Sequence, residues 1–134
     1  MTEARKAAYL LAIIVLLIGG QRLYRSVKET RAHTTAEAAL IRYRREIPIG
    51  MTRDSLAQRL KSRGLPHFES CCWNEPHVLA MLAKVADSYA PWYCSEVPIY
   101  VVFEFTSTKS EMPARSPEDR VKSIHLGSRG EGCL

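Results

Sequence analysis

Residues 49–64 read Ile-Gly-Met-Thr-Arg-Asp-Ser-Leu-Ala-Gln-Arg-Leu-Lys-Ser-Arg-Gly, and this stretch carries the clearest helix signals of the chain. Thr52 is a natural N-cap, because its hydroxyl can accept a hydrogen bond from a free backbone N–H of the first turn. Leu56 and Leu60 lie one turn apart on the face that we expect to be buried. Gly64 suits the left-handed residue that follows many helices. We therefore expect a short helix between Thr52 and Gly64.

After this helix the apolar pattern changes to a period of two, which is typical of strands. Ile99, Val101, Phe103 and Phe105 alternate with the residues between them, and we expect this strand to place one face in the core. Residues 78–85 also suit a helix by composition, but their position before the return strand favours a strand. A polar loop is expected at 106–119. The expected strands are residues 67–73, 78–85, 99–106 and 121–126.

Before residue 49 the sequence predicts a second helix. Thr34 followed three residues later by Glu37 is a capping-box signature. The apolar face of this helix continues to about Glu46, and the residue before Pro48 is pushed out of the helical region. The residues of that face are Ala36, Ala39, Leu40 and Tyr43.

The turn, the short helix and the apolar strands behind it resemble small envelope domains of the SmpA/OmlA lipoprotein type, which are built as two helices followed by an antiparallel sheet. The residues that carry the resemblance are Gly50, Met51, Thr52, Leu56, Leu60 and Gly64. The resemblance covers 16 residues and implies an architecture rather than a function. The chain has no cysteine just after its apolar run to be acylated, so the lipoproteins' role in outer-membrane protein assembly is not carried over.

Residues 7–20 form an apolar run with no polar side chain except the hydroxyl of Tyr9. Arg5 and Lys6 precede it, as charged residues precede the apolar core of a signal sequence. Small residues at the spacing that signal peptidase requires are missing near its end. Continued to Tyr24, the helix is about 27 Å long against a hydrocarbon core of ~30 Å. We therefore expect an uncleaved membrane anchor; a cleaved signal and a soluble core helix are the alternatives.

Two signals disagree about the side of the membrane on which the domain lies. Positive residues are more numerous after the apolar run than before it, and this bias alone would keep the domain in the cytoplasm. The short tail before the run is typical of a signal anchor, and four cysteines are easier to understand in an oxidising compartment. We expect an extracytoplasmic domain.

Basic residues recur at every third position just after the run: Arg22, Arg25, Lys28 and Arg31. They suit contacts with lipid phosphates at up to ~1 kcal/mol each, and a merely solvated stem is the alternative. Residues 21–63 hold 11 Lys and Arg against 4 Asp and Glu, whereas residues 64–134 hold 6 against 9. Few aromatic residues are interleaved with the basic ones, so we expect no nucleic-acid partner.

Cys71, Cys72, Cys94 and Cys133 admit three disulfide pairings. A bond between Cys71 and Cys72 would close a small ring around a strained peptide, and we expect it not to form. Successive side chains of a strand point to opposite faces, so the two adjacent cysteines should find separate partners. One joins Cys94 and the other joins Cys133, with the order left open. Buried free thiols are the alternative.

The remaining chemistry is weakly supported. His67, His77 and His125 could join the cysteines around zinc, but neither Cys-x-x-Cys nor His-x-x-x-His spacing occurs. A nucleophilic pair of Cys72 and His77 lacks an identifiable third group or oxyanion donor. We expect no catalytic residues, no cofactor and no metal.

Three aromatic residues lie next to cysteines in the sequence: Trp73, Trp92 and Tyr93. We expect them to pack in the core or in loops, where Trp92 and Tyr93 could lie against a disulfide of Cys94. A ligand platform is the alternative.

The 134 residues, of which 25% are charged and 46% apolar, suit one folded domain rather than a disordered or fibrous chain. We expect an α+β protein with an N-terminal transmembrane helix and two further helices packed on an antiparallel sheet of three to four strands. The expected parts are a short tail at 1–6, a transmembrane signal anchor at 7–24, a basic stem and helix at 25–46, and a small α+β domain at 47–134.

These features predict a single-pass protein of the bacterial cell envelope, which is not an enzyme and whose extracytoplasmic domain binds an envelope protein. Lipid around the N-terminal helix is its second partner. The alternative is a domain that faces the cytoplasm, keeps its cysteines reduced, and binds metal or a polyanion through the basic half.

Overall fold

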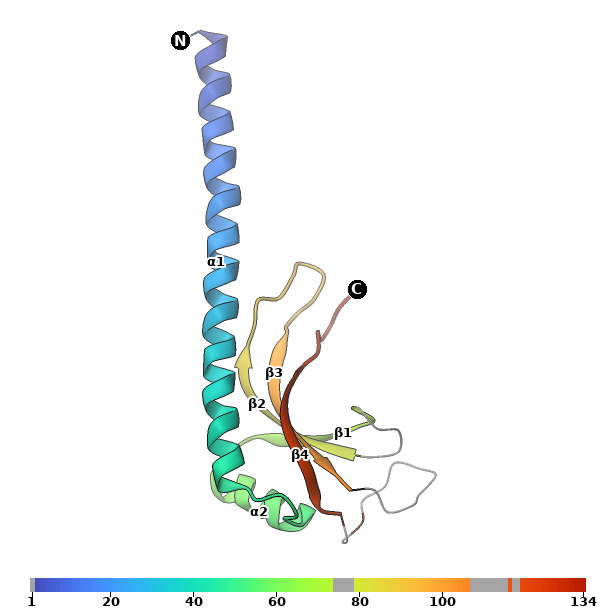
Figure 1. Cartoon of the computed structure of the whole chain (residues 1–134). Helices are drawn as coiled ribbons and strands as arrows, with labels where there is room; N and C mark the ends of the chain where they lie inside the picture. Colours follow the sequence, from blue (N-terminus) through green and yellow to red (C-terminus); the bar gives the residue numbers. More distant parts are fainter. Residues whose placement is uncertain (1, 74–78, 107–115, 117–118) are drawn as a thin grey trace.

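The chain folds as an α+β protein, and its described residues form two helices and a four-stranded antiparallel sheet (Figure 1). The computed structural model describes residues 2–73, 79–106, 116 and 119–134. The strands follow one another in the sheet in the order β1-β2-β3-β4. The elements are α1 (Glu3–Glu46), α2 (Arg53–Ser62), β1 (His67–Cys71), β2 (Leu79–Asp87), β3 (Pro98–Phe105) and β4 (Val121–Ser128).

The first helix, α1, is a single helix of 44 residues, which corresponds to about 66 Å. Its N-terminal half projects away from the domain, and its C-terminal half lies along the sheet (Figure 1). The prediction that a separate helix starts at Thr34 is wrong. Thr34 lies inside α1, where its Oγ1 donates to the Thr30 carbonyl at 2.9 Å, so its hydroxyl bonds back into the helix instead of capping it.

The second helix, α2, begins and ends where the sequence predicts. Thr52 is the N-cap, and its hydroxyl accepts from the Ser55 N–H at 3.4 Å. At the other end Gly64 has φ +65°, its N–H donates to the Lys61 carbonyl, and the Leu65 N–H donates to the Leu60 carbonyl, both at 3.0 Å. These two bonds form a Schellman motif, which satisfies the last carbonyls of the helix.

All four expected strands are present, including the ambiguous one, which is β2. Val78 and most of the expected loop at 106–119 lie outside the described residues. The first strand ends at Cys71 rather than at Trp73, and β4 continues to Ser128. The register shifts between Lys84 and Ala86 in β2 and between Glu104 and Phe105 in β3.

One face of the sheet forms the main core with the two helices. Leu56 and Leu60 of α2 are buried there together with Tyr43 of α1. The Tyr43 ring meets the Phe103 ring edge-on, with 5.6 Å between centroids. The prediction that Leu56 and Leu60 lie on the buried face of the short helix is therefore confirmed. Ile99, on the same face, packs instead under Ala32 and Ala36 of α1.

The opposite face of the sheet is also partly buried, so the prediction that β3 places only one face in the core is wrong. Tyr100 and Val102 form a second cluster there with Ala80 and Leu82 of β2. Trp73 folds over this cluster, because Gly127 has no side chain to obstruct it. A Cβ at Gly127 would lie 2.4 Å from the Cζ2 atom of Trp73.

Leu60→Ala is expected to lower the free energy of unfolding by about 2 to 5 kcal/mol, since it removes a fully buried leucine from the main core. The measurement is chemical denaturation of the full chain in detergent micelles, followed by near-UV circular dichroism. Gln58→Ala on the exposed side of the same helix is the matched control and should change stability by less than about 0.5 kcal/mol. Equal effects of the two substitutions would contradict the placement of Leu60 in the core.

Candidate functional site

The β2–β3 connection, residues 88–97, lies beside α1 at the end of the domain that faces the N-terminal half of the helix (Figure 1). The Ser88 N–H donates to the Val97 carbonyl at 2.9 Å and closes the base of the loop. The Arg25 guanidinium lies over the Tyr89 ring, 5.1 Å from its centroid. Glu29, which bonds Arg25, raises the pKa of that guanidinium most, and Tyr89 and Tyr93 add to the shift. The loop is thus held next to the first basic turns after the apolar run. We call this region the loop end of the domain.

The chain after β4 returns to the same loop and is fastened to it. Cys94 forms a disulfide with Cys133, and the Leu134 N–H donates to the Tyr93 carbonyl at 2.8 Å. The Tyr100 hydroxyl donates to the Glu131 carboxylate at 2.6 Å. Burial and this bond together raise the pKa of Tyr100 to about 12. These contacts make the loop and the segment after β4 one unit.

The structure pairs the cysteines differently from the prediction. Cys71 bonds to Cys72, and Cys94 bonds to Cys133. The prediction excluded the first bond because it closes a small ring around a strained peptide, and it gave the two cysteines separate partners because it placed both in a strand. The strand ends at Cys71, and Cys72 has φ +64°, so the alternation of faces does not extend to Cys72. Two disulfides are present, as predicted, but in the one pairing that the prediction excluded.

The four predicted membrane-surface residues all lie on α1, at the end of the apolar segment. Arg25 pairs with Glu29 at 3.0 Å, and Arg22 and Arg31 are exposed. Lys28 is half-buried. The structure therefore places them beside the loop rather than in a pocket.

The two described histidines among those named for zinc lie on different strands. His67 lies on β1, where its Nδ1 is 3.0 Å from the Leu65 carbonyl oxygen. His125 lies on β4, 4.0 Å from the Glu104 carboxylate. His77 lies outside the described residues. Within the part of the chain that the structure describes, no three His, Cys, Asp or Glu side chains are grouped so that they could hold a metal ion.

The three aromatic residues differ in their surroundings. Trp73 packs edge-on against Tyr100, with ring centroids 6.4 Å apart, as the core prediction requires. Trp92 is 89% exposed and Tyr93 is 46% exposed, so neither is a core residue. Their rings contact each other at 5.7 Å. The prediction of a packed position is wrong for Trp92, because the loop carries it away from the sheet.

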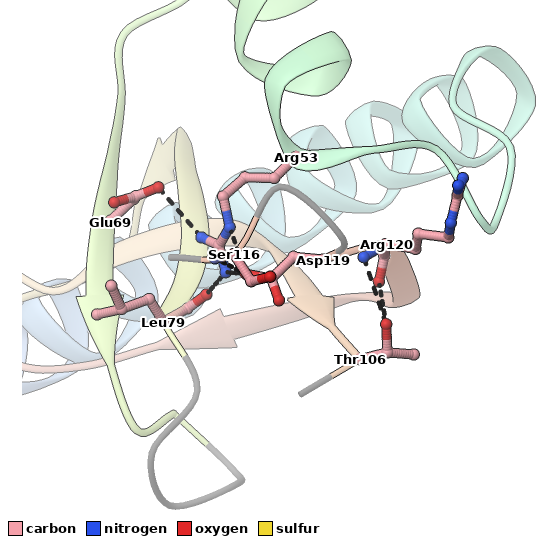
Figure 2. Close-up of polar contacts among 7 residues, drawn as sticks. All are labelled: Arg53, Glu69, Leu79, Thr106, Ser116, Asp119 and Arg120. Atoms are coloured by element: carbon pink, nitrogen blue, oxygen red, sulfur yellow. Dashed lines mark hydrogen bonds and ion pairs between the residues drawn. The ribbon is translucent and has the colours of Figure 1, made fainter. Parts of the chain in front are cut away.

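Figure 2 shows a buried cluster around Arg53, at the start of α2, and α2 lies at the end of the domain away from the β2–β3 loop (Figure 1). Arg53 is the first residue of α2 and is only 3% exposed. Its guanidinium pairs with Asp119 at 2.9 Å and with Glu69 of β1 at 3.1 Å. It also donates to the Leu79 carbonyl at 2.7 Å and lies 3.9 Å from the centroid of the Phe105 ring. One side chain therefore joins α2 to three strands and to the segment before β4.

The sequence contained a signal for this cluster that our prediction did not use. The N-terminus of a helix carries partial positive charge, so a cation in its first turn is unfavourable in water. Arg53 occupies that position in a helix whose other signals are all favourable. A buried acidic partner, here Asp119, accounts for it. Buried and paired in this way, Arg53 joins α2 to the sheet.

A hollow of about 470 Å³ lies between α1 and β2. Its apolar lining comes from Ala38, Ala39 and Val85, and Arg42 is the basic side chain on α1 at its edge. Tyr43 of the main core also lines it, and it forms a surface groove rather than a closed cavity.

The chain matches no protein-family model, no curated protein and no solved structure. The resemblance to the SmpA/OmlA type therefore stays an expectation drawn from six residues.

Arg53→Met is expected to lower the free energy of unfolding by about 3 to 5 kcal/mol, because it leaves Asp119 buried without its cation. Adding Asp119→Asn to Arg53→Met should recover part of that loss, since an amide costs less to bury than an unpaired carboxylate. Denaturation of the full chain in micelles measures both. A double variant no more stable than the single one would contradict the ion-pair explanation.

The cysteine pairing predicts a defined set of tryptic peptides from protein alkylated before any reduction. Residues 64–84 should form one peptide with an internal disulfide, lighter by two hydrogens than its reduced form. Residues 85–109 should be linked to residues 130–134. Mass spectrometry distinguishes this pattern from the cross-paired one, in which residues 64–84 would be linked to both other peptides. Four alkylated thiols would contradict both patterns.

Proposed function

We propose that this protein is a membrane-tethered binding module without enzymatic activity, whose domain lies on the extracytoplasmic side of a bacterial cell envelope. The observation that carries the proposal is the continuity of α1. One helix contains an apolar segment long enough to span a bilayer and, further along, the residues that pack on the sheet. By length and composition alone a signal sequence would pass the same test.

The surroundings of the apolar segment support a span. None of its 18-residue window is buried within the protein, so a core role does not account for its composition. Exposed apolar side chains follow one another around the helix; they include Leu10, Ile13, Val15, Leu16, Leu17 and Ile18. A helix that is apolar on all sides needs an apolar solvent, and the hydrocarbon core of a bilayer provides it.

The disulfides support the extracytoplasmic side. All four cysteines are oxidised in the structure. Stable disulfides form and persist outside the cytoplasm, whereas thiols inside it are kept reduced. This argument outweighs the positive charges that follow the apolar segment, because their bias is one of several influences on orientation.

The groove between α1 and β2 supports a binding role. Its apolar lining with Arg42 at its edge suits a protein segment that carries small apolar residues and an acidic one. An envelope protein held at the same membrane surface is the partner that such a tether would meet. No bound group is needed for this role.

The side of the membrane is tested by fusing, after Leu134, a reporter enzyme that is active only outside the cytoplasm. We expect an active fusion, and we expect the same fusion to lose activity when residues 2–24 are deleted. An inactive full-length fusion, together with fluorescence of a cytoplasm-specific reporter at the same site, would favour the alternative. That alternative is a cytoplasmic domain that binds a polyanion or metal through its basic half.

The binding role is tested in the same cells with a photoreactive amino acid at Ala38, inside the groove. We expect a discrete crosslinked band whose partner can be identified. The same residue at Glu37, which is exposed on α1 but does not line the groove, is the matched control. Equal crosslinking from both positions, or from neither, would contradict the groove as the binding surface.

A further inference from the structure

We propose that Trp92 and Tyr93, at the tip of the β2–β3 loop, form a second membrane contact that inserts into the headgroup layer of the bilayer spanned by α1. The inference rests on the proposed membrane span and extends it, because a second contact fixes the orientation of the domain on the bilayer. The partner of the two aromatic side chains is lipid of the same membrane.

The two aromatic residues are presented by a tight turn. The Cys94 N–H donates to the Pro91 carbonyl at 2.9 Å, so Trp92 and Tyr93 are the central residues of a β-turn. Trp92 is 89% exposed, and its ring lies edge-on to that of Tyr93. Together they form an apolar projection that the domain itself leaves uncovered.

The loop lies at the level at which the apolar segment of α1 ends. Arg25 contacts Tyr89 of the loop, and Arg25 directly follows Tyr24, the last residue of the proposed span. One residue of helix corresponds to about 1.5 Å along its axis. The headgroup layer is about 5 to 8 Å thick on each side of the hydrocarbon core. Tyr89 is therefore placed at the depth of the headgroups if α1 spans the membrane.

The chemistry of this tip suits that layer. Tryptophan and tyrosine concentrate at membrane–water interfaces, where an apolar ring and a polar N–H or O–H meet both surroundings. Arg22 and Arg31 lie on the same section of α1 and can contact lipid phosphates. A protein partner would not require the tip to lie level with the end of the span, whereas a bilayer does.

The tip is also held in place before it meets lipid. The Cys94–Cys133 disulfide and the bond from the Leu134 N–H to the Tyr93 carbonyl fasten it to the segment after β4. Little conformational freedom is left to lose on insertion, which favours binding.

The test uses full-length protein in lipid nanodiscs, whose two surfaces are both accessible, with bromine on the lipid acyl chains as a quencher of tryptophan emission. The chain has two tryptophans, so Trp73→Phe leaves Trp92 as the only reporter. We expect its emission to shift to the blue and to lose roughly half of its intensity with bromine near the headgroup end of the acyl chain. Bromine near the end of the chain should quench it less. Trp92→Phe, which leaves the half-buried Trp73, is the matched control and should show little quenching by either lipid.

A third variant separates this proposal from the proposed span. It carries Leu16→Trp with Trp73→Phe and Trp92→Phe, and it should be quenched most by bromine deep in the bilayer. A second quencher, aqueous iodide, reports on exposure of Trp92 to water. If lipid bromine quenches the tryptophan at position 16 but not Trp92, the membrane contact is overturned and the span stands, whether or not iodide quenches Trp92. No lipid quenching at position 16 would overturn the span and the contact together. Circular dichroism checks that each variant is folded.

Discussion

The α1 helix has to satisfy two environments with one uninterrupted backbone. Over residues 7–20 every face is apolar and exposed, whereas further along only one stripe, with Ala32, Ala36 and Tyr43, is buried. If a flexible linker joined the apolar segment to the domain, the domain would be free to rotate relative to that segment. Because the backbone hydrogen bonds of α1 continue without a break, the orientation of the sheet relative to the apolar segment is fixed. The position of the β2–β3 loop beside Arg25 depends on this continuity.

Different interactions hold the two ends of the domain together. At the loop end, the Cys94–Cys133 bond and backbone hydrogen bonds hold the β2–β3 loop and the segment after β4 together. At the far end, Arg53 provides a charged junction inside protein, where Asp119 and Glu69 balance its charge. The arrangement leaves the rigid, exposed aromatic tip on the side of the apolar helix and places the buried ionic junction on the side away from it (Figure 1).

The sheet shows why local sequence patterns predict where a strand lies better than they predict what packs against its two faces. The alternation of Ile99, Val101 and Phe103 predicts which face meets the helices, and the structure agrees. The opposite face carries Tyr100 and Val102, whose burial depends on Trp73 crossing over Gly127. Trp73 and Gly127 are far apart in the sequence, and nothing in the pattern of either strand relates them. Whether the second face is covered is therefore a tertiary property.

The sequence by itself determined the elements whose signals are local: the cap at Thr52, the glycine that ends α2, the strand periodicity and the apolar run. Each depends on contacts within a few residues, and those contacts form wherever the segment lies. The tertiary structure alone decided the cysteine pairing, the burial of Arg53 and the exposure of Trp92. Each of these depends on which distant segment lies opposite, or on where a strand stops. Cys72 shows the difference most clearly, because β1 ends at Cys71, two residues before the predicted end, and strand alternation therefore does not apply to Cys72.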